Sequence, residues 1–148
     1  METISIVAPV SGELVELTQL DDKVFSEYLM GVGIAIQSME NMICSPIDGS
    51  VSYVADTGHA IVISNSNFDI MIHIGIDTCK LHGEPFKILV NENMEVKKGQ
   101  ELIMVDFKQI QKHGLDDRVI LILMENKNMD LIDNLPKSVN RGDLIIKV

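Results

Sequence analysis

Two short apolar runs separated by a polar turn, between Gly58 and Lys80, constrain the fold of this chain more than any other feature. The first run reads AIVI, the second reads IMIHI, and a polar Asn-Ser-Asn segment, residues 65–67, lies between them. Short β-branched runs that flank a polar turn are typical of two antiparallel strands. If residues 65–67 form a three-residue loop, Ser64 pairs with Phe68. The sequence therefore predicts an antiparallel hairpin here.

This register places His59 directly opposite His73. Opposed residues share a sheet face with Cβ atoms about 4.5–5.5 Å apart, so the pairing predicts two facing imidazoles, set among Ile61, Ile63 and Met71. Two hydrogen-bonded histidines in a half-buried sheet would satisfy the pattern. A nucleophile, a proton shuttle or a metal site would satisfy it as well. A neutral imidazole can act as a nucleophile or as a metal ligand, and a second imidazole can donate a hydrogen bond to the group that the first one carries.

Further short apolar runs, broken by Gly, Pro, Asn and Asp, recur along the chain and predict strands at residues 31–36, 50–54, 87–90, 102–105 and 119–124. The last two are almost continuously apolar, which predicts burial on both faces. Strands punctuated this often indicate an all-β fold, an antiparallel β-sandwich or barrel-sandwich. Helix is expected only as short turns, at residues 22–30, 107–113 and 128–135.

Two sequence echoes predict an internal duplication. Residues 8–12 read APVSG and residues 45–49 read SPIDG, each within a strand-like context. Residues 96–103, VKKGQELI, recur as residues 139–145, VNRGDLI, with one residue fewer. Chance similarity between short turn motifs is the competing explanation.

Length and charge narrow the class of protein. A chain of 148 residues fits one domain, residues 1–148, and can bury a core without disulfides or metal. The net charge of −10 argues against nucleic acid and favours a positively charged protein partner. The N-terminus shows no secretory signal, and no apolar run approaches the ~18 residues that span a bilayer. We therefore expect a cytoplasmic location, no direct membrane insertion, and no disulfide between Cys44 and Cys79.

An ordered set of motifs resembles the glucose-type IIA component of the bacterial phosphoenolpyruvate-dependent sugar phosphotransferase system, from about Ile4 to Val148. The motifs are APVSGE at residues 8–13, GVGIAI at 31–36, SPIDG at 45–49, TGHA at 57–60 and HIGIDT at 73–78, with Leu81, Gly83 and Glu84 following.

The resemblance implies a phosphoryl carrier. His73 would accept a phosphoryl group from the phosphohistidine of the small carrier protein HPr, and would pass it to a cysteine on the IIB domain of a sugar permease. His59 would support the transfer, and Thr57 would help to hold the histidine pair. To attack, His73 must be neutral with one ring nitrogen free, and we expect a backbone carbonyl to bind the other nitrogen's hydrogen. No metal or nucleotide is required, and the chain has no P-loop.

The resemblance also implies a docking surface, an apolar patch ringed by acidic residues. The corresponding apolar positions are Val24, Met30, Ala55, Ile61, Met71 and Cys79, and the acidic pair is Asp22 and Asp77. Each has a plainer alternative, core packing for the apolar residues and a turn or cap for each Asp. A zinc ion bridged by His59 and His73 at a partner interface is a further option. We expect His82 and His113 to be solvated.

Some features depart from the family pattern or suggest other classes. Val32, Ala55, Met71 and Pro85 stand where other residue types are usual, which concerns partner choice more than the histidine pair. A biotin- or lipoyl-type carrier domain lacks its lysine here, because the turn offers Glu40 and Asn41. A zinc metallopeptidase of the lysostaphin type needs an H-x-H pair, which does not occur in this sequence. A regulatory protein whose unphosphorylated face binds metabolic enzymes or transporters stays open as the alternative function.

Overall fold

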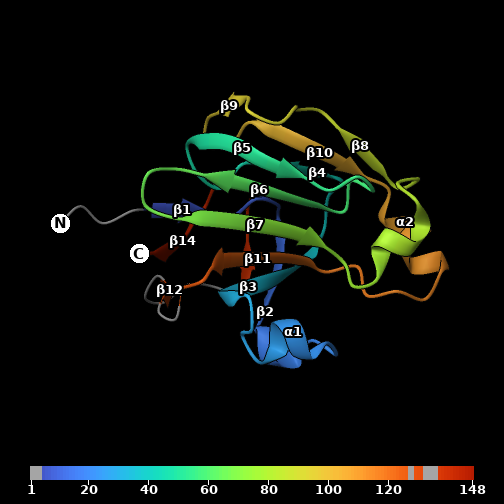
Figure 1. Cartoon of the computed structure of the whole chain (residues 1–148). Coiled ribbons are helices and arrows are strands. Elements are labelled where there is room, and N and C mark those ends of the chain that lie inside the picture. The colour runs from blue at the N-terminus through green and yellow to red at the C-terminus, as the bar shows by residue number, and fades with distance from the viewer. Residues whose placement is uncertain (1–4, 127–128, 132–136) are drawn as a thin grey trace.

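The computed structural model describes residues 5–126, 129–131 and 137–148. Within them the strands form one eight-stranded sheet and two three-stranded sheets, all antiparallel, with few short helices (Figure 1). The prediction of an all-β antiparallel fold is confirmed. The large sheet has the order β13 (Ser138–Val139), β2 (Gly12–Val15), β3 (Gly31–Ser38), β11 (Val119–Met124), β7 (Asp69–Ile74), β6 (Ala60–Ser64), β5 (Gly49–Val54), β9 (Glu95–Val96). The small sheets are β1 (Ser5–Val7), β14 (Leu144–Lys147), β12 (Asp130–Leu131), and β4 (Met42–Cys44), β10 (Glu101–Val105), β8 (Phe86–Ile88).

The central strands bury both of their faces. On β7, Ile70, Ile72 and Ile74 point into the inner core between the sheets, while Met71 packs on the opposite face with an outer cluster. The outer cluster consists of Leu17, Leu20, Phe25, Ala35, Val62, Met71, Ile120 and Ile122. Strand β11 is buried on both faces as predicted, but Met104 on β10 is 45% exposed, so that prediction fails for β10. β10 lies in a small sheet whose second face is open to solvent at Met104.

The helices are shorter than the sequence suggested. Residues 22–30 form only α1 (Lys23–Ser26), whose N-cap Asp22 accepts a hydrogen bond from the Val24 amide, and residues 107–113 form α2 (Phe107–Lys112). One-turn 3₁₀ helices add η1 (Leu17–Gln19) and η2 (Thr78–Leu81). The prediction of a helix at residues 128–135 is wrong at residues 130–131, which form strand β12. Pairing of β12 with β14 overrides the local helix preference. Residues 128 and 132–135 lie outside the described residues.

The hairpin between β6 and β7 is one residue out of the predicted register. Ser64 pairs with Asp69, and Ala60 pairs with His73. The loop therefore has four residues, 65–68. The Asn65 side chain accepts hydrogen bonds from the amides of residues 67 and 68 at 2.8 and 3.0 Å. Phe68 is part of the loop through its hydrogen bonds with Asn65, and its side chain packs into the inner core.

The internal duplication appears as an approximate two-fold arrangement of the large sheet. Gly12 pairs with Val139 on one edge, and Gly49 pairs with Val96 on the other. The equivalent turns repeat the same hydrogen bonds: Gly142 N to Ala8 O (2.9 Å) matches Gly99 N to Ser45 O (2.8 Å), and Arg141 N to Ser11 Oγ (2.7 Å) matches Lys98 N to Asp48 Oδ1 (2.7 Å). The strand order is symmetric about the β11–β7 pair: β3 corresponds to β6, β2 to β5 and β13 to β9.

The same comparison corrects the gap assumed in the second echo. Val7 pairs with Leu144 across a bulge, and Cys44 pairs with Glu101 across a bulge at the equivalent place. Leu144 therefore matches Glu101 rather than Leu102. The two segments align from Val96 and Val139 onward without a missing residue.

Candidate functional site

His73 is the last outward-facing residue of β7, and its ring is held by the turn that follows. Its Nδ1 lies 2.7 Å from the carbonyl oxygen of Gly75. Because a carbonyl only accepts hydrogen bonds, Nδ1 carries the hydrogen and Nε2 carries the lone pair. Gly75 has φ +72°, and a Cβ there would lie 2.5 Å from both Asp116 O and the Thr78 side chain, so glycine is required. The expected carbonyl partner of His73 is confirmed.

His59 also lies at this site, although its backbone is just outside strand β6. It precedes the first residue of β6 and follows Gly58, which has φ +72°. The backbone of His59 lies opposite Ile74, whose amide donates to its carbonyl oxygen at 2.8 Å. His59 is therefore not directly opposite His73, as the predicted register required. Its ring nevertheless meets that of His73, with centroids 4.9 Å apart at 79°, because side-chain alternation holds only within the strand.

Thr57 orients the second imidazole. Its Oγ1 lies 2.5 Å from Nδ1 of His59, so the threonine fixes that nitrogen and leaves Nε2 as the ring's other hydrogen-bonding atom. The two histidines and Thr57 thus form one constellation at the end of β7 and the start of β6, as the sequence suggested.

Burial keeps both histidines neutral. It lowers the pKa of His59, and it lowers the pKa of His73 to about 4, with the neighbouring His59 adding to the effect. The Gly75 carbonyl and the carboxylates of Asp22 and Asp77 act in the opposite direction on His73. A neutral His73 with a free Nε2 lone pair is a nucleophile at physiological pH.

Phe25 was not predicted as a site residue. Its ring, 5% exposed, packs against the His73 imidazole with centroids 5.0 Å apart at 57°. The helix signal at residues 22–30 located α1, which Figure 1 shows next to β2 and β3, but no sequence pattern indicated that Phe25 reaches His73 on β7. Phe25 limits the directions in which the His73 ring can turn.

The sequence of residues 4–129 matches the family described as phosphoenolpyruvate-dependent sugar phosphotransferase system, EIIA 1. The chain belongs to this family. Its fold is that of glucose permease IIA from Mycoplasma capricolum, with a TM-score of 0.90 and 30% identity over 99% of this chain and 96% of that one.

Two curated relatives of this EIIA chain come from Staphylococcus carnosus (strain TM300): the PTS system glucose-specific EIICBA component and the glucoside-specific EIICBA component. Each is 39% identical over 145 residues, which is 97% of this chain and 21% of the relative. The EIIA chain therefore spans about a fifth of the length of these relatives. In the part described here, no helix is long and apolar enough to cross a membrane.

The residues expected to dock partners fall into three groups in this EIIA domain. Val24, Asp77 and Cys79 are exposed; Asp22 and Met30 are half-buried; Ala55 and Met71 are buried. Ile61 is wrong as a docking residue, because it is 0% exposed and packs in the inner core. The observed register puts Val62, not Ile61, on the face of Met71.

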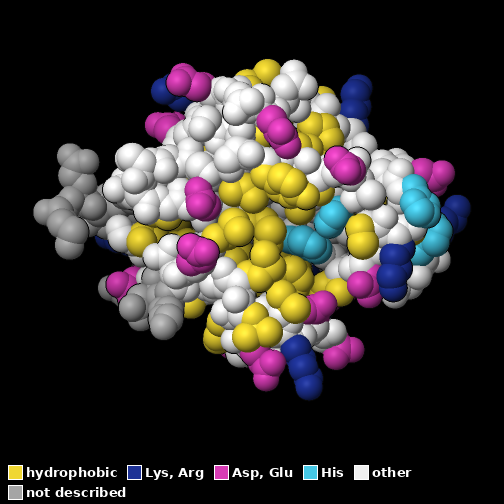
Figure 2. Space-filling view, in the orientation of Figure 1, with side chains coloured by type: hydrophobic (Ala, Val, Ile, Leu, Met, Phe, Trp, Pro, Cys, Tyr) yellow, Lys and Arg dark blue, Asp and Glu magenta, His cyan; other side chains and the backbone are white. Residues whose placement is uncertain are grey.

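The outer cluster continues to the surface as an apolar patch beside the histidines. Figure 2 shows hydrophobic side chains gathered on this face, with histidine at one side of them and acidic side chains around the margin. Four large hydrophobic residues are exposed in this region. Val24 lies on α1, Tyr28 and Leu29 lie in the turn that follows it, and Tyr53 lies on β5. Asp77 forms a solvent-exposed ion pair with Lys80 at 3.7 Å.

The remaining histidines and both cysteines take no part in the site. His82 and His113 are exposed, as predicted. Both cysteines are free thiols, Cys44 buried and Cys79 exposed. Among residues 5–126, 129–131 and 137–148, no three His, Cys, Asp or Glu side chains are grouped to hold a metal ion. The histidine pair alone offers zinc only two ring nitrogens.

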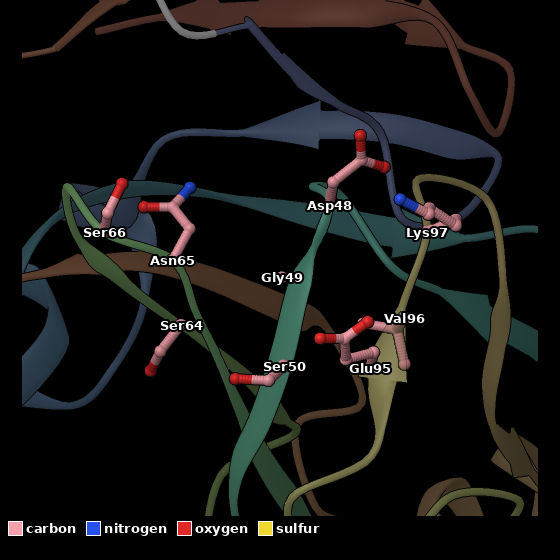
Figure 3. Close-up of a pocket in the computed structure, with 9 residues that line it drawn as sticks. All are labelled: Asp48, Gly49, Ser50, Ser64, Asn65, Ser66, Glu95, Val96 and Lys97. Atoms are coloured by element: carbon pink, nitrogen blue, oxygen red, sulfur yellow. The ribbon is translucent and has the colours of Figure 1, made fainter.

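A separate polar hollow of about 530 Å³ lies at the other end of β6. In Figure 3, Asp48 and Lys97 lie on one side of it, Asn65 and Ser66 on the other, and the start of β5 runs between them. Ser64, the last residue of β6, lines it, whereas Ala60, the first, adjoins His59. This hollow contains neither imidazole nor thiol and lies apart from the histidine site.

Proposed function

We propose that this EIIA domain is a phosphoryl carrier, in which Nε2 of His73 accepts a phosphoryl group from phospho-HPr and delivers it to a cysteine of a sugar-specific IIB domain. The observation that carries this proposal is the 2.7 Å contact between His73 Nδ1 and Gly75 O. It leaves one nucleophilic nitrogen beside a second imidazole, at a site flanked by an exposed apolar patch.

The transfer step exchanges one P–N bond for another. The Nε2 lone pair of His73 attacks phosphorus in line, the P–N bond to the donor histidine breaks, and the donor imidazole leaves with the electron pair. Positive charge develops on the His73 ring, and the Gly75 carbonyl stabilises it through the retained Nδ1–H. Onward transfer reverses these roles, with a thiolate attacking phosphorus and His73 leaving. Such loose transition states need positioning and hydrogen-bond donors rather than covalent help.

His59 would supply a donor to the phosphoryl oxygens. When the Thr57 hydroxyl donates to Nδ1 of His59, the hydrogen of the neutral ring lies on Nε2 and can be donated to the group on His73. The edge-on contact of the two rings is compatible with this role. Thr57 then acts as a positioning residue for His59.

The family and the surface support the proposed partners. The curated relatives are EIICBA components, which supports a IIB domain as the acceptor. The net charge of −10 and the acidic margin of the apolar patch suit a basic donor such as HPr, because complementary fields speed encounter. Transfer among these partners would take place in the cytoplasm.

No cofactor is needed for this chemistry. Zinc bound by His59 and His73 at a partner interface would require ligands from the partner or from water, because tetrahedral sites use four. Such zinc would occupy the nitrogen that attacks. We therefore expect phosphoryl loading from preformed phospho-HPr to proceed unchanged in the presence of EDTA, and we expect added zinc to slow it.

Incubation with phosphoenolpyruvate, magnesium, enzyme I and HPr tests the proposal. We expect an acid-labile, base-stable mass increase of one phosphoryl group on the wild-type domain and none on His73→Ala. His82→Ala serves as the matched control, because His82 is exposed and outside the site, and it should load normally. Labelling of a residue other than His73 would overturn the assignment. An unlabelled wild-type domain would favour the regulatory binding function instead.

A further inference from the structure

The turn that positions His73 is attached to a second loop, which precedes β11. The Gly75 amide donates to the carbonyl oxygen of Arg118 at 2.8 Å, and the Ile76 amide donates to that of Asp116 at 3.1 Å. These two bonds continue the β7–β11 pairing beyond Ile74, the last residue of β7. The position of the Gly75 peptide therefore depends on the 116–118 loop.

The Asp116 side chain holds that loop in shape. Its Oδ1 accepts a hydrogen bond from the Arg118 amide at 3.0 Å, and its Oδ2 lies 3.3 Å from the Arg118 guanidinium. The carboxylate thus closes a turn on its own backbone, as Asp side chains do in loops. Closing this turn fixes the direction of both carbonyls that bind the Gly75 and Ile76 amides.

Contact between the loop and the Gly75 turn is tight. An added Cβ at Gly75 would lie 2.5 Å from Asp116 O, so the two backbones touch without space for adjustment. On the other side, Thr78 Oγ1 donates to the Ile74 carbonyl at 2.5 Å. Since Gly75 O is the acceptor for His73 Nδ1, a small displacement of the 116–118 loop changes the distance that fixes the His73 tautomer.

We propose that Asp116 is a positioning residue for His73: by closing the 116–118 turn it holds the Gly75 carbonyl where it keeps the hydrogen on Nδ1 and the lone pair on Nε2. The consequence for phosphoryl transfer rests on the proposed carrier function. The effect on the tautomer does not, because it concerns the unphosphorylated domain alone.

The same loop contains a matched control. Asp117 has the same charge and accepts hydrogen bonds from the side chains of Gln37 and Gln111 at 3.0 and 2.7 Å. Neither bond leads to Gly75. Arg118→Ala is a second control, because it removes the guanidinium but keeps the amide that Asp116 Oδ1 binds. Both variants should retain the wild-type tautomer.

The primary measurement is the tautomer of His73, read from its ring nitrogen shifts in long-range ¹H–¹⁵N spectra at pH 7. We expect hydrogen on Nδ1 in wild type, Asp117→Ala, Arg118→Ala and Asp116→Asn, since Asn keeps an Oδ1 acceptor. Asp116→Ala and Asp116→Glu should show loss of the pure Nδ1–H form. Glu keeps the charge but moves the acceptor, so it tests the proposal even if the Ala variant unfolds.

The second measurement is the rate of phosphoryl loading from phospho-HPr. We expect Asp116→Glu to load at least about tenfold more slowly, within the roughly 100-fold that a 1 Å misplacement can cost, and Asp116→Asn to load within about twofold of wild type. A wild-type tautomer in a folded Asp116→Glu domain would overturn the proposal. An altered tautomer in Asp116→Asn would overturn it as well. If wild type takes no label while Asp116→Glu changes the tautomer, the carrier function fails and the positioning role stands.

Discussion

The imidazole of His59 meets that of His73 edge to face, with centroids 4.9 Å apart and planes at 79°. This geometry lets one ring direct its edge toward a group carried by the other, which parallel stacking would prevent. Each ring is fixed at Nδ1 by a different oxygen, so the proposal assigns the role of nucleophile to His73 and that of hydrogen-bond donor to His59.

Replacing His59 by Gln should separate loading from delivery. The Gln amide can donate to a phosphoryl group on His73, so loading from HPr should stay within a few-fold of wild type. Onward transfer to IIB should fall by about 10²-fold or more, the scale for a positioned catalytic group. Rapid-quench measurement of both half-reactions checks this. Equal slowing of the two steps would contradict a role specific to delivery.

Replacing Gly75 by Ala should damage both stability and activity. Alanine at φ +72° costs about 1–2 kcal/mol, and its Cβ would also collide with Asp116 O and Thr78. The control is Gly99→Ala, where φ is +86° but no atom lies within 4 Å of the added Cβ. Urea unfolding should show the larger loss for Gly75→Ala, and only that variant should lose phosphoryl loading. Equal losses would show that the contact with Asp116 is unimportant.

The His73 pKa predicts how stability depends on pH. Because the folded-state pKa is lowered to about 4, the unfolded chain binds more protons between that value and the ordinary 6.5. Stability from His73 is therefore fully present above about pH 6.5 and declines as pH falls toward 4. NMR titration should show His73 neutral at pH 5.5, and His73→Ala should reduce the acid slope of the unfolding free energy. A His73 midpoint near 6.5 would contradict the burial argument.

Val24 and Ile61 should behave in opposite ways. Ile61 is fully buried, so Ile61→Ala should cost about 2–5 kcal/mol of stability, with loss of HPr binding only as far as the domain unfolds. Val24 is 41% exposed on α1, so Val24→Asp should change stability by about 0.5 kcal/mol or less. It should weaken HPr binding measurably. Titration calorimetry beside thermal unfolding checks both, and undiminished HPr affinity in Val24→Asp would remove α1 from the docking surface.

The sequence was most informative where the determinants are local. Alternating Ile and Val residues, turn residues and the HIGIDT motif predicted β6, β7 and the histidine pair, and the need for a neutral nucleophile predicted a carbonyl on His73. Each depends on residues close together in the chain.

What could not be predicted depends on loop length and on tertiary packing. The Asn65 side chain closes a four-residue loop instead of the expected three-residue loop, so the register shifts by one residue and Val62, not Ile61, lies on the face of Met71. The contacts of Phe25 and Asp116 with the His73 region link segments that are 40 or more residues apart in the chain, and no local sequence pattern indicates them.

The approximate two-fold of the large sheet has a last consequence. Ala60 pairs with His73 where Gly33 pairs with Ile122, so the correspondence sets His73 against Ile122 and His59 against Val32. The molecule thus carries an aliphatic counterpart of the histidine pair, in which Val32 and Ile122 fill the equivalent backbone positions. Because an aliphatic pair is enough for the scaffold, folding alone does not require imidazoles at these places, which supports the proposed carrier function.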